Sequence, residues 1–106
     1  AVEKIVADAR PYPFGHVGDG NIHYNISQPA GMDPVLFLQQ KAVLNQAVLD
    51  IVYDLQGSFS AEHGVGLLKT ELIPKYKGNT ALQTMRAIKQ AIDPLNLMNP
   101  GKVVDL

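Results

Sequence analysis

All three histidines of this 106-residue chain lie in two short glycine-rich segments. The first segment covers residues 15–25 and contains His16 and His23; the second covers residues 61–66 and contains Glu62 and His63. Two imidazoles and one carboxylate are a ligand set that a divalent metal takes in catalytic sites, where further coordination positions stay open. The remaining imidazole is suited to proton transfer. The pattern therefore indicates a metal-dependent active site.

The spacing of His16 and His23 sets a condition on the backbone. On one straight strand, residues seven positions apart point to opposite faces. On a helix the same spacing covers about 10.5 Å, too far for one ion with ligand bonds near 2 Å. Both imidazoles can meet one metal only if the chain folds between them. Gly18, Asp19 and Gly20 favour such a fold, because glycine accepts positive φ without a steric penalty.

The neighbouring residues extend this hypothetical site. Asn25 lies two positions beyond His23, so on a strand it shares the same face and can reach a bound substrate. Glu62 supplies an anionic oxygen that completes a His₂Glu ligand set. His63 would point differently on a strand but can turn back at the bend that Gly64 allows.

A structural interpretation of the histidines stands beside this one. A single histidine next to glycines is usually a turn or core residue, and His-x₆-His is a weak metal pattern. On spacing alone the two interpretations are about equally supported. Asp19 is a turn residue in either case. Lys69, Lys75 and Lys77 form a solvated face, although Lys69 is near enough to the Glu-His pair to attract an anion.

The composition narrows the function classes. The formal net charge is −1 and there is no run of Lys and Arg, so the chain lacks the electrostatic signature of nucleic-acid binding. No apolar run has the length of a transmembrane segment. The absence of Cys excludes disulfides and thiolate metal sites. A cytoplasmic protein is expected, associated with membranes only through partners, or a mitochondrial one in a eukaryote.

The residue pattern predicts an α+β fold, with a small antiparallel sheet and helices on one face. Val2, Ile5, Val6 and Ala9 have helical spacing, and Pro11 and Pro13 should end that helix. Asp33 is the expected cap of the longest helix, and Gly57 its stop. The expected strands are 12–17, 21–27 and a short 58–61; the expected helices are 34–55, 67–73 and one from Asn79 or Thr80 to Ile92, ended by Asp93 and Pro94. The opening helix has no cap and the sheet is small, so we expect a piece of a longer protein.

Three ordered segments resemble the signature motifs of the FAD-linked 2-hydroxyacid dehydrogenases. They are Gly-His-Val-Gly-Asp-Gly-Asn-Ile-His-Tyr-Asn at 15–25, Ser-Ala-Glu-His-Gly-Val-Gly-Leu-Leu-Lys at 60–69 and Leu-Met-Asn-Pro-Gly-Lys-Val at 97–103. That family includes the glycolate oxidase flavoprotein subunit, cytochrome-dependent D-lactate dehydrogenase and D-2-hydroxyglutarate dehydrogenase. Three motifs in order are far more specific than any one alone.

The resemblance implies a role for each site residue. His16, His23 and Glu62 would bind a divalent metal, zinc or manganese. His63 would be the general base that accepts the substrate's hydroxyl proton, and Asn25 would contact the substrate. In the family the Asn-Pro-Gly-Lys tail returns toward the flavin domain, so Asn99 and Lys102 would lie near FAD.

The resemblance also implies what lies outside the chain. The family's FAD-binding domain precedes this region, so residues 1–106 would be the C-terminal portion of a partial ferredoxin-like substrate and metal-binding domain. We expect no FAD and no turnover in the chain alone. The expected partners are a small 2-hydroxy acid, the upstream FAD-binding domain and an electron acceptor. Apolar edges of an incomplete sheet can also drive homo-oligomerisation.

Two other function classes stay open on the sequence. A self-sufficient zinc hydrolase with the same His₂Glu site would be active without flavin, through a metal-bound water. A non-catalytic domain with structural histidines would show no metal dependence.

Overall fold

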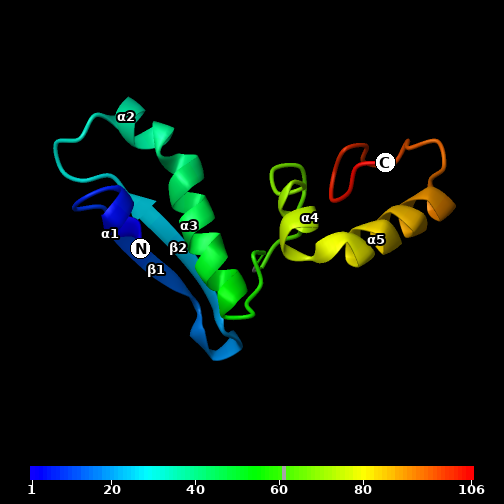
Figure 1. Ribbon diagram of the computed structural model, residues 1–106, viewed down its shortest axis with the longest axis horizontal. Helices are drawn as coiled ribbons and strands as arrows, with labels where there is room; N and C mark the ends of the chain where they lie inside the picture. The colour runs from blue at the N-terminus through cyan, green and yellow to red at the C-terminus, as the bar shows by residue number, and fades with distance from the viewer. Residues whose placement is uncertain (61) are drawn as a thin grey trace. The chain divides into compact units, whose positions relative to one another are not determined.

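The computed structural model describes residues 1–60 and 62–106. The chain divides after residue 61 into two compact units, called here the first and the second unit. The first unit contains α1 (Val2–Ile5), β1 (Arg10–His16), the 3₁₀ helix η1 (Val17–Asp19), β2 (Asn21–Ser27), α2 (Pro34–Gln39) and α3 (Lys41–Asp54). Its two strands form an antiparallel hairpin (Figure 1). The α+β fold class is therefore confirmed.

The hairpin begins earlier than the sequence pattern predicts. Strand β1 starts at Arg10 rather than Tyr12, and α1 ends at Ile5, well before the prolines that were expected to end it. Pro11 and Pro13 lie inside the strand instead. Successive residues of a strand direct their N–H groups to opposite edges, so residues two positions apart face the same edge. Both prolines can therefore face the edge that pairs with no strand, where a missing N–H costs no ladder hydrogen bond.

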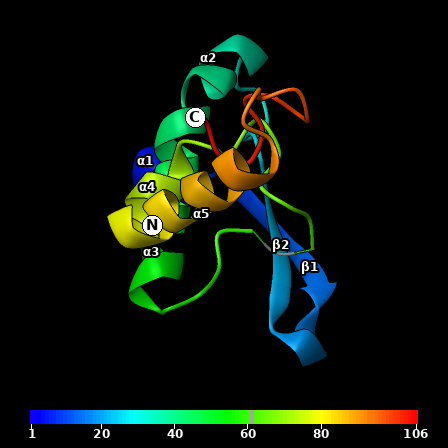
Figure 2. The ribbon, with the colours of Figure 1, turned by 90° about the vertical axis from the view of Figure 1, so that its right-hand side faces the viewer.

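The core of the first unit lies between α1, α3 and the hairpin. Val2, Val6, Ala9 and Leu44 form the buried cluster, and Ile26 of β2 packs against it. The apolar spacing at the start of the chain thus marks core residues, although the helix itself is only one turn long. Both α1 and α3 lie on the same side of the hairpin (Figure 2), as expected for helices on one face of a sheet.

The long helix predicted over residues 34–55 is two helices. Asp33 caps α2 as predicted, its carboxylate accepting the N–H of Val35 at 2.7 Å. At Gln40 the helical hydrogen bonding changes, because its N–H bonds to the Phe37 carbonyl three residues back, as in a 3₁₀ helix, rather than to the residue four back as in an α-helix. Helix α3 ends in a Schellman motif: Gln56 takes the left-handed conformation (φ 58°) and Gly57 donates its N–H to the Val52 carbonyl at 2.7 Å.

The third strand predicted over residues 58–61 is wrong for residues 58–60, which are not part of a sheet. The Ser58 hydroxyl donates to the Ser60 carbonyl at 2.9 Å and accepts the Ser60 N–H at 3.3 Å. This local bonding competes with strand pairing. Residue 61 lies outside the described residues.

The second unit contains α4 (Leu72–Tyr76) and α5 (Gly78–Ile92). The helix predicted over residues 67–73 is wrong in its bounds, since residues 66–71 form turns and Pro74 lies inside α4. Proline is tolerated there because the first turn of a helix leaves its N–H groups unbonded in any case. Helix α5 starts at Gly78, so Asn79 and Thr80 are not its caps, but it ends before Asp93 and Pro94 as predicted.

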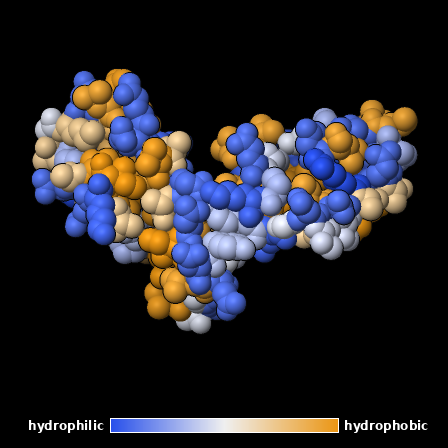
Figure 3. Space-filling view, viewed as in Figure 1, coloured by the Kyte–Doolittle hydropathy of each residue, from blue (hydrophilic) through white to orange (hydrophobic). Residues whose placement is uncertain are grey.

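Both units leave apolar side chains exposed. In the first unit these include Val35, Leu36 and Leu38 of α2, and Tyr12, Phe14, Val17, Ile22 and Tyr24 of the hairpin. Figure 3 shows apolar surface over α2 and over the end of the hairpin. Exposed apolar side chains can drive association between copies, which stays a prediction, as does the incompleteness of the sheet. Among the described residues, no helix has the length and apolarity to cross a membrane.

Candidate active site

The hairpin brings His16 and His23 to one face. His16 pairs with Asn21 and Phe14 pairs with His23 in the antiparallel register. Directly paired residues share a face, and so do diagonal neighbours such as His16 and His23, whose α-carbons are about 7–8 Å apart in a regular ladder. The backbone fold that the spacing required is made by η1 and by Gly20, which takes the left-handed conformation with φ 68°. Two imidazoles can therefore approach one ligand from adjacent strands.

This face of the hairpin lies away from the core. Ile26 packs against the buried cluster, so the odd-numbered residues of β2 point to the opposite side. Asn25 pairs with Tyr12 and lies on the same face as His23. The predicted common face of His23 and Asn25 is thus consistent with the register. A ligand can reach both side chains from the solvent side.

Two residues that the sequence pattern did not single out shape this face. The Phe14 ring stacks on the His23 imidazole, with centroids 5.1 Å apart and planes inclined by 18°. The stack limits the rotation of the imidazole and so orients its nitrogens. Asn21 carries a buried Oδ1 that has no hydrogen-bond partner among the described residues. An unsatisfied buried acceptor is costly, and a donor on a ligand or an ordered water would satisfy it.

The donors on this face fit a divalent metal in their chemistry. Imidazole nitrogens are common zinc ligands, and a carboxylate is the usual third ligand of a catalytic site. Within the described part of either unit, no three His, Asp or Glu side chains gather closely enough to form a complete metal site. Glu62 belongs to the second unit, so the hairpin supplies two of the three predicted ligands.

Glu62 and His63 are exposed at the start of the second unit, in a bend that precedes the glycines. Gly66 takes the left-handed conformation, with φ 61°. Its carbonyl accepts the N–H of Val103 at 2.7 Å. The loop that carries the predicted base is therefore bonded to the C-terminal tail, a link that no local sequence pattern reveals.

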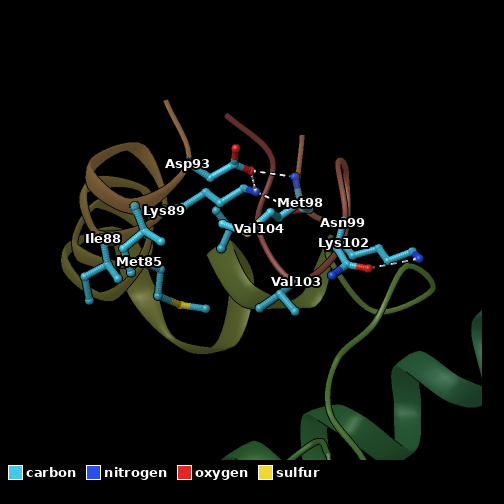
Figure 4. Close-up of a pocket in the computed structure, with 10 residues that line it drawn as sticks. Met85, Ile88, Lys89, Asp93, Met98, Asn99, Lys102, Val103 and Val104 are labelled. Carbon is cyan, nitrogen blue, oxygen red and sulfur yellow. Dashed lines mark hydrogen bonds and ion pairs between the residues drawn. The ribbon is translucent and has the colours of Figure 1, made fainter. Parts of the chain in front are cut away.

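The tail holds the predicted flavin-side residues near one another. Lys102 donates its backbone N–H to the Asn99 carbonyl at 3.2 Å, and its ammonium lies 3.5 Å from Asn99 Oδ1. Both residues line a pocket of about 410 Å³ between α5 and the tail (Figure 4). The other lining residues are mainly apolar: Met85, Ile88, Ile92, Met98, Val103 and Val104, together with Lys89 and Asp93. The Asn99 amide and the Lys102 ammonium are hydrogen-bond donors of the kind that the acceptor-rich edge of a flavin ring would take; in Figure 4 they lie at the tail side of the pocket, and the Lys102 side chain extends away from α5.

Asp93 anchors the start of this tail. It is the buried charged residue of the described chain, only 5% exposed. Its carboxylate accepts hydrogen bonds from the Lys89 ammonium and the Met98 N–H (Figure 4). It also accepts one from the N–H of Leu97. The bond from Lys89, together with those from the two amides, lowers the pKa of Asp93 below its ordinary value, against the opposing effect of burial.

Comparison with known proteins agrees with the three motifs. Residues 2–103 match the family described as FAD linked oxidases, C-terminal domain. A D-2-hydroxyglutarate dehydrogenase from Stutzerimonas stutzeri is 42% identical over 90 residues, which are 85% of this chain and 19% of that protein. A probable mitochondrial D-lactate dehydrogenase from Danio rerio is 39% identical over 93 residues, 87% of this chain and 18% of that protein. The mitochondrial cytochrome D-lactate dehydrogenase of Arabidopsis thaliana is 38% identical, with 86% of this chain and 16% of that protein covered.

The chain belongs to the C-terminal domain family of the FAD linked oxidases. It spans about a fifth of the length of the curated relatives it matches. The relatives carry two different substrate names, D-2-hydroxyglutarate and D-lactate, at similar identity.

Proposed function

We propose that this chain is the C-terminal portion of the substrate-binding domain of an FAD-dependent dehydrogenase that oxidises a small D-2-hydroxy acid to the 2-oxo acid. The observation that carries the proposal is the common open face of His16, His23 and Asn25 on the hairpin. Membership of the FAD linked oxidase family supports the redox class. The names of the relatives support a D-2-hydroxy acid as the substrate class.

In this proposal each site residue has one task. His16, His23 and Glu62 hold a divalent metal, zinc or manganese. Asn25 donates a hydrogen bond to the substrate on the same strand face. His63 accepts the proton of the C2 hydroxyl, because a neutral imidazole is a suitable base near neutral pH.

When bound, the metal would supply a Lewis acid for the hydroxy acid and FAD would supply the hydride acceptor, which is chemistry that the side chains lack. The protein residues bind and orient the acid and remove its hydroxyl proton. Asn99 and Lys102 contribute donors on the flavin side. The expected external partner is an electron acceptor.

The proposal is tested in the whole flavin-loaded protein that contains this chain, with metal content measured by elemental analysis. Rapid mixing without oxygen should show bleaching of the flavin by one or more of D-lactate, glycolate and D-2-hydroxyglutarate. One acid that bleaches the flavin in a protein with near-stoichiometric metal supports the proposal and selects the substrate. Bleaching by none of the three acids, in a protein without metal, would contradict it and favour structural histidines.

A further inference from the structure

The Asp93 carboxylate and the Lys89 ammonium together hold the peptide unit at which the tail begins. Asp93 Oδ1 accepts the N–H of Leu97 at 2.9 Å and Oδ2 accepts that of Met98 at 2.8 Å. Lys89 donates both to the Asp93 carboxylate and to the Met98 carbonyl. Figure 4 shows these groups converging from α5 and the tail. We call this set of bonds the Asp93 clasp.

The clasp immediately precedes a segment of unusual backbone. Asn99 (φ 49°), Gly101 (φ 68°) and Val103 (φ 65°) all take the left-handed conformation. For a non-glycine residue, and above all for β-branched Val103, this conformation is strained and persists only where surrounding contacts enforce it. The contacts that enforce it are the clasp before the segment and the bond from Val103 to Gly66 after it.

The clasp and the flavin-side residues also share one pocket. Lys89, Asp93, Asn99 and Lys102 all line the 410 Å³ pocket beside α5. Lys89 and Asp93 are occupied by each other and by the backbone, whereas Asn99 and Lys102 lie farther along the tail. The first pair therefore fixes the backbone from which the second pair projects.

We propose that Lys89 and Asp93 are positioning residues that hold Asn99 and Lys102 in place against the flavin. This inference rests on the proposed function, which puts Asn99 and Lys102 beside the cofactor. It adds a role for two residues that do not themselves touch the cofactor. A purely stabilising role would change the stability of the protein but would not act through Lys102.

The test is a double-mutant cycle in the whole flavin-loaded protein. Asp93→Asn alone should slow flavin reduction by a D-2-hydroxy acid about 10- to 100-fold, since small misplacements of a contact cost that much. It should also shift the absorbance spectrum of the oxidised flavin, in the same direction as Lys102→Met. In the Lys102→Met background the further effect of Asp93→Asn should be less than about twofold, because coupled residues are not additive.

Arg86→Gln is the matched control. Arg86 lies one turn before Lys89 on α5 and also bonds to the tail, donating to the Asp105 carbonyl at 2.8 Å. That bond lies beyond Lys102, so its loss should leave the flavin spectrum and the reduction rate unchanged. If Asp93→Asn does not fold, the same cycle with Lys89→Met decides, and Lys89→Arg should restore the wild-type spectrum.

The outcomes separate this inference from the proposed function. If Lys102→Met changes neither the flavin spectrum nor the rate, the tail does not lie at the flavin and the proposed function fails at that point. If Lys102→Met changes both but Asp93→Asn is fully additive with it, or acts only on thermal stability, the positioning role is wrong.

Discussion

Val103 donates its backbone N–H to the carbonyl of Gly66 at 2.7 Å, which ties the loop behind His63 to the tail behind Lys102. The two segments are far apart in sequence, and each belongs to a different motif. Because of this direct hydrogen bond, a substitution that displaces one segment should also displace the other. A substitution at Gly66 therefore tests whether the conformation of this loop contributes to the stability of the second unit.

Gly66→Ala should lower the stability of the second unit. Gly66 has φ 61°, and a Cβ there would meet no atom within 4 Å, so the cost is conformational rather than steric. A left-handed alanine costs about 1–2 kcal/mol. Gly64→Ala is the matched control, since Gly64 has no positive φ and equally open surroundings. Urea unfolding should show a lower midpoint for Gly66→Ala and an unchanged one for Gly64→Ala. Equal midpoints for the two variants would contradict the left-handed conformation of Gly66.

Gly15→Ala should disrupt the hairpin that carries the two histidines. A Cβ on Gly15 would lie 2.4 Å from the Asn21 carbonyl oxygen and 3.1 Å from the Ile22 α-carbon, both backbone atoms of β2. The strands must separate to accept it, at a cost of about 3 kcal/mol. Gly18→Ala meets nothing within 4 Å and should be nearly neutral. The measurement is the thermal unfolding midpoint of each variant. If Gly15→Ala unfolded at the wild-type temperature, the two strands would not approach each other as closely at Gly15 as the structure shows.

Asp93 should make stability depend on pH in the acid range. Its pKa is lowered in the folded protein, chiefly by Lys89, so near its ordinary value of 3.8 the unfolded chain binds more protons than the folded one. Stability therefore rises with pH there. The contribution is present above the ordinary pKa and is lost as the pH falls through the lowered folded value.

The measurement is the difference in unfolding free energy between wild type and Asp93→Asn from neutral pH downward. The difference should be constant down to about pH 5 and shrink below pH 4, once the carboxylate of the unfolded chain starts to bind protons. A difference that stays the same down to pH 2 would mean that the Lys89 bond does not favour the ionised carboxylate.

The zinc affinity of histidine variants should distinguish the predicted metal ligands, His16 and His23, from the predicted base, His63. His16→Asn and His23→Asn should each weaken zinc binding by more than about 100-fold, because even residues behind a ligand contribute 10–100-fold. His63→Asn should leave zinc bound. Competition with a chelator, in the whole protein, gives the affinities. Zinc loss in His63→Asn, with zinc retained in His16→Asn, would reverse the assigned roles.

The parts of the fold that could be predicted from the sequence are those specified by neighbouring residues, such as turn dipeptides, helix caps and polar–apolar alternation. The hairpin followed from Asp19-Gly20 and from polar–apolar alternation, and the α2 cap from Asp33-Pro34. The break at Gln40 could not be predicted, because the apolar spacing continues across it. Strand 58–61 was predicted from a short run whose serines bond locally instead.

The same division applies to the candidate site. The sequence singles out His16, His23 and Asn25 as candidates because their residue types and spacing are suited to metal and substrate binding, and their roles stay predictions. Phe14 was missed because its contact with His23 exists only in the register of the hairpin. The sequence indicates only that Asp93 ends a helix, because its bonds to Lys89 and Met98 depend on how the tail returns to α5. The link from Gly66 to Val103 has no sequence signal at all.

The most direct test of the central claim is a single-turnover measurement of flavin reduction in the whole protein, wild type against His63→Asn, with the D-2-hydroxy acid that bleaches the wild type. We predict that flavin reduction is about 10²- to 10⁴-fold slower in the variant, the usual contribution of a general base, with metal and flavin content unchanged. Equal rates in the two proteins would show that His63 is not the base and that the site assigned here does not carry the reaction.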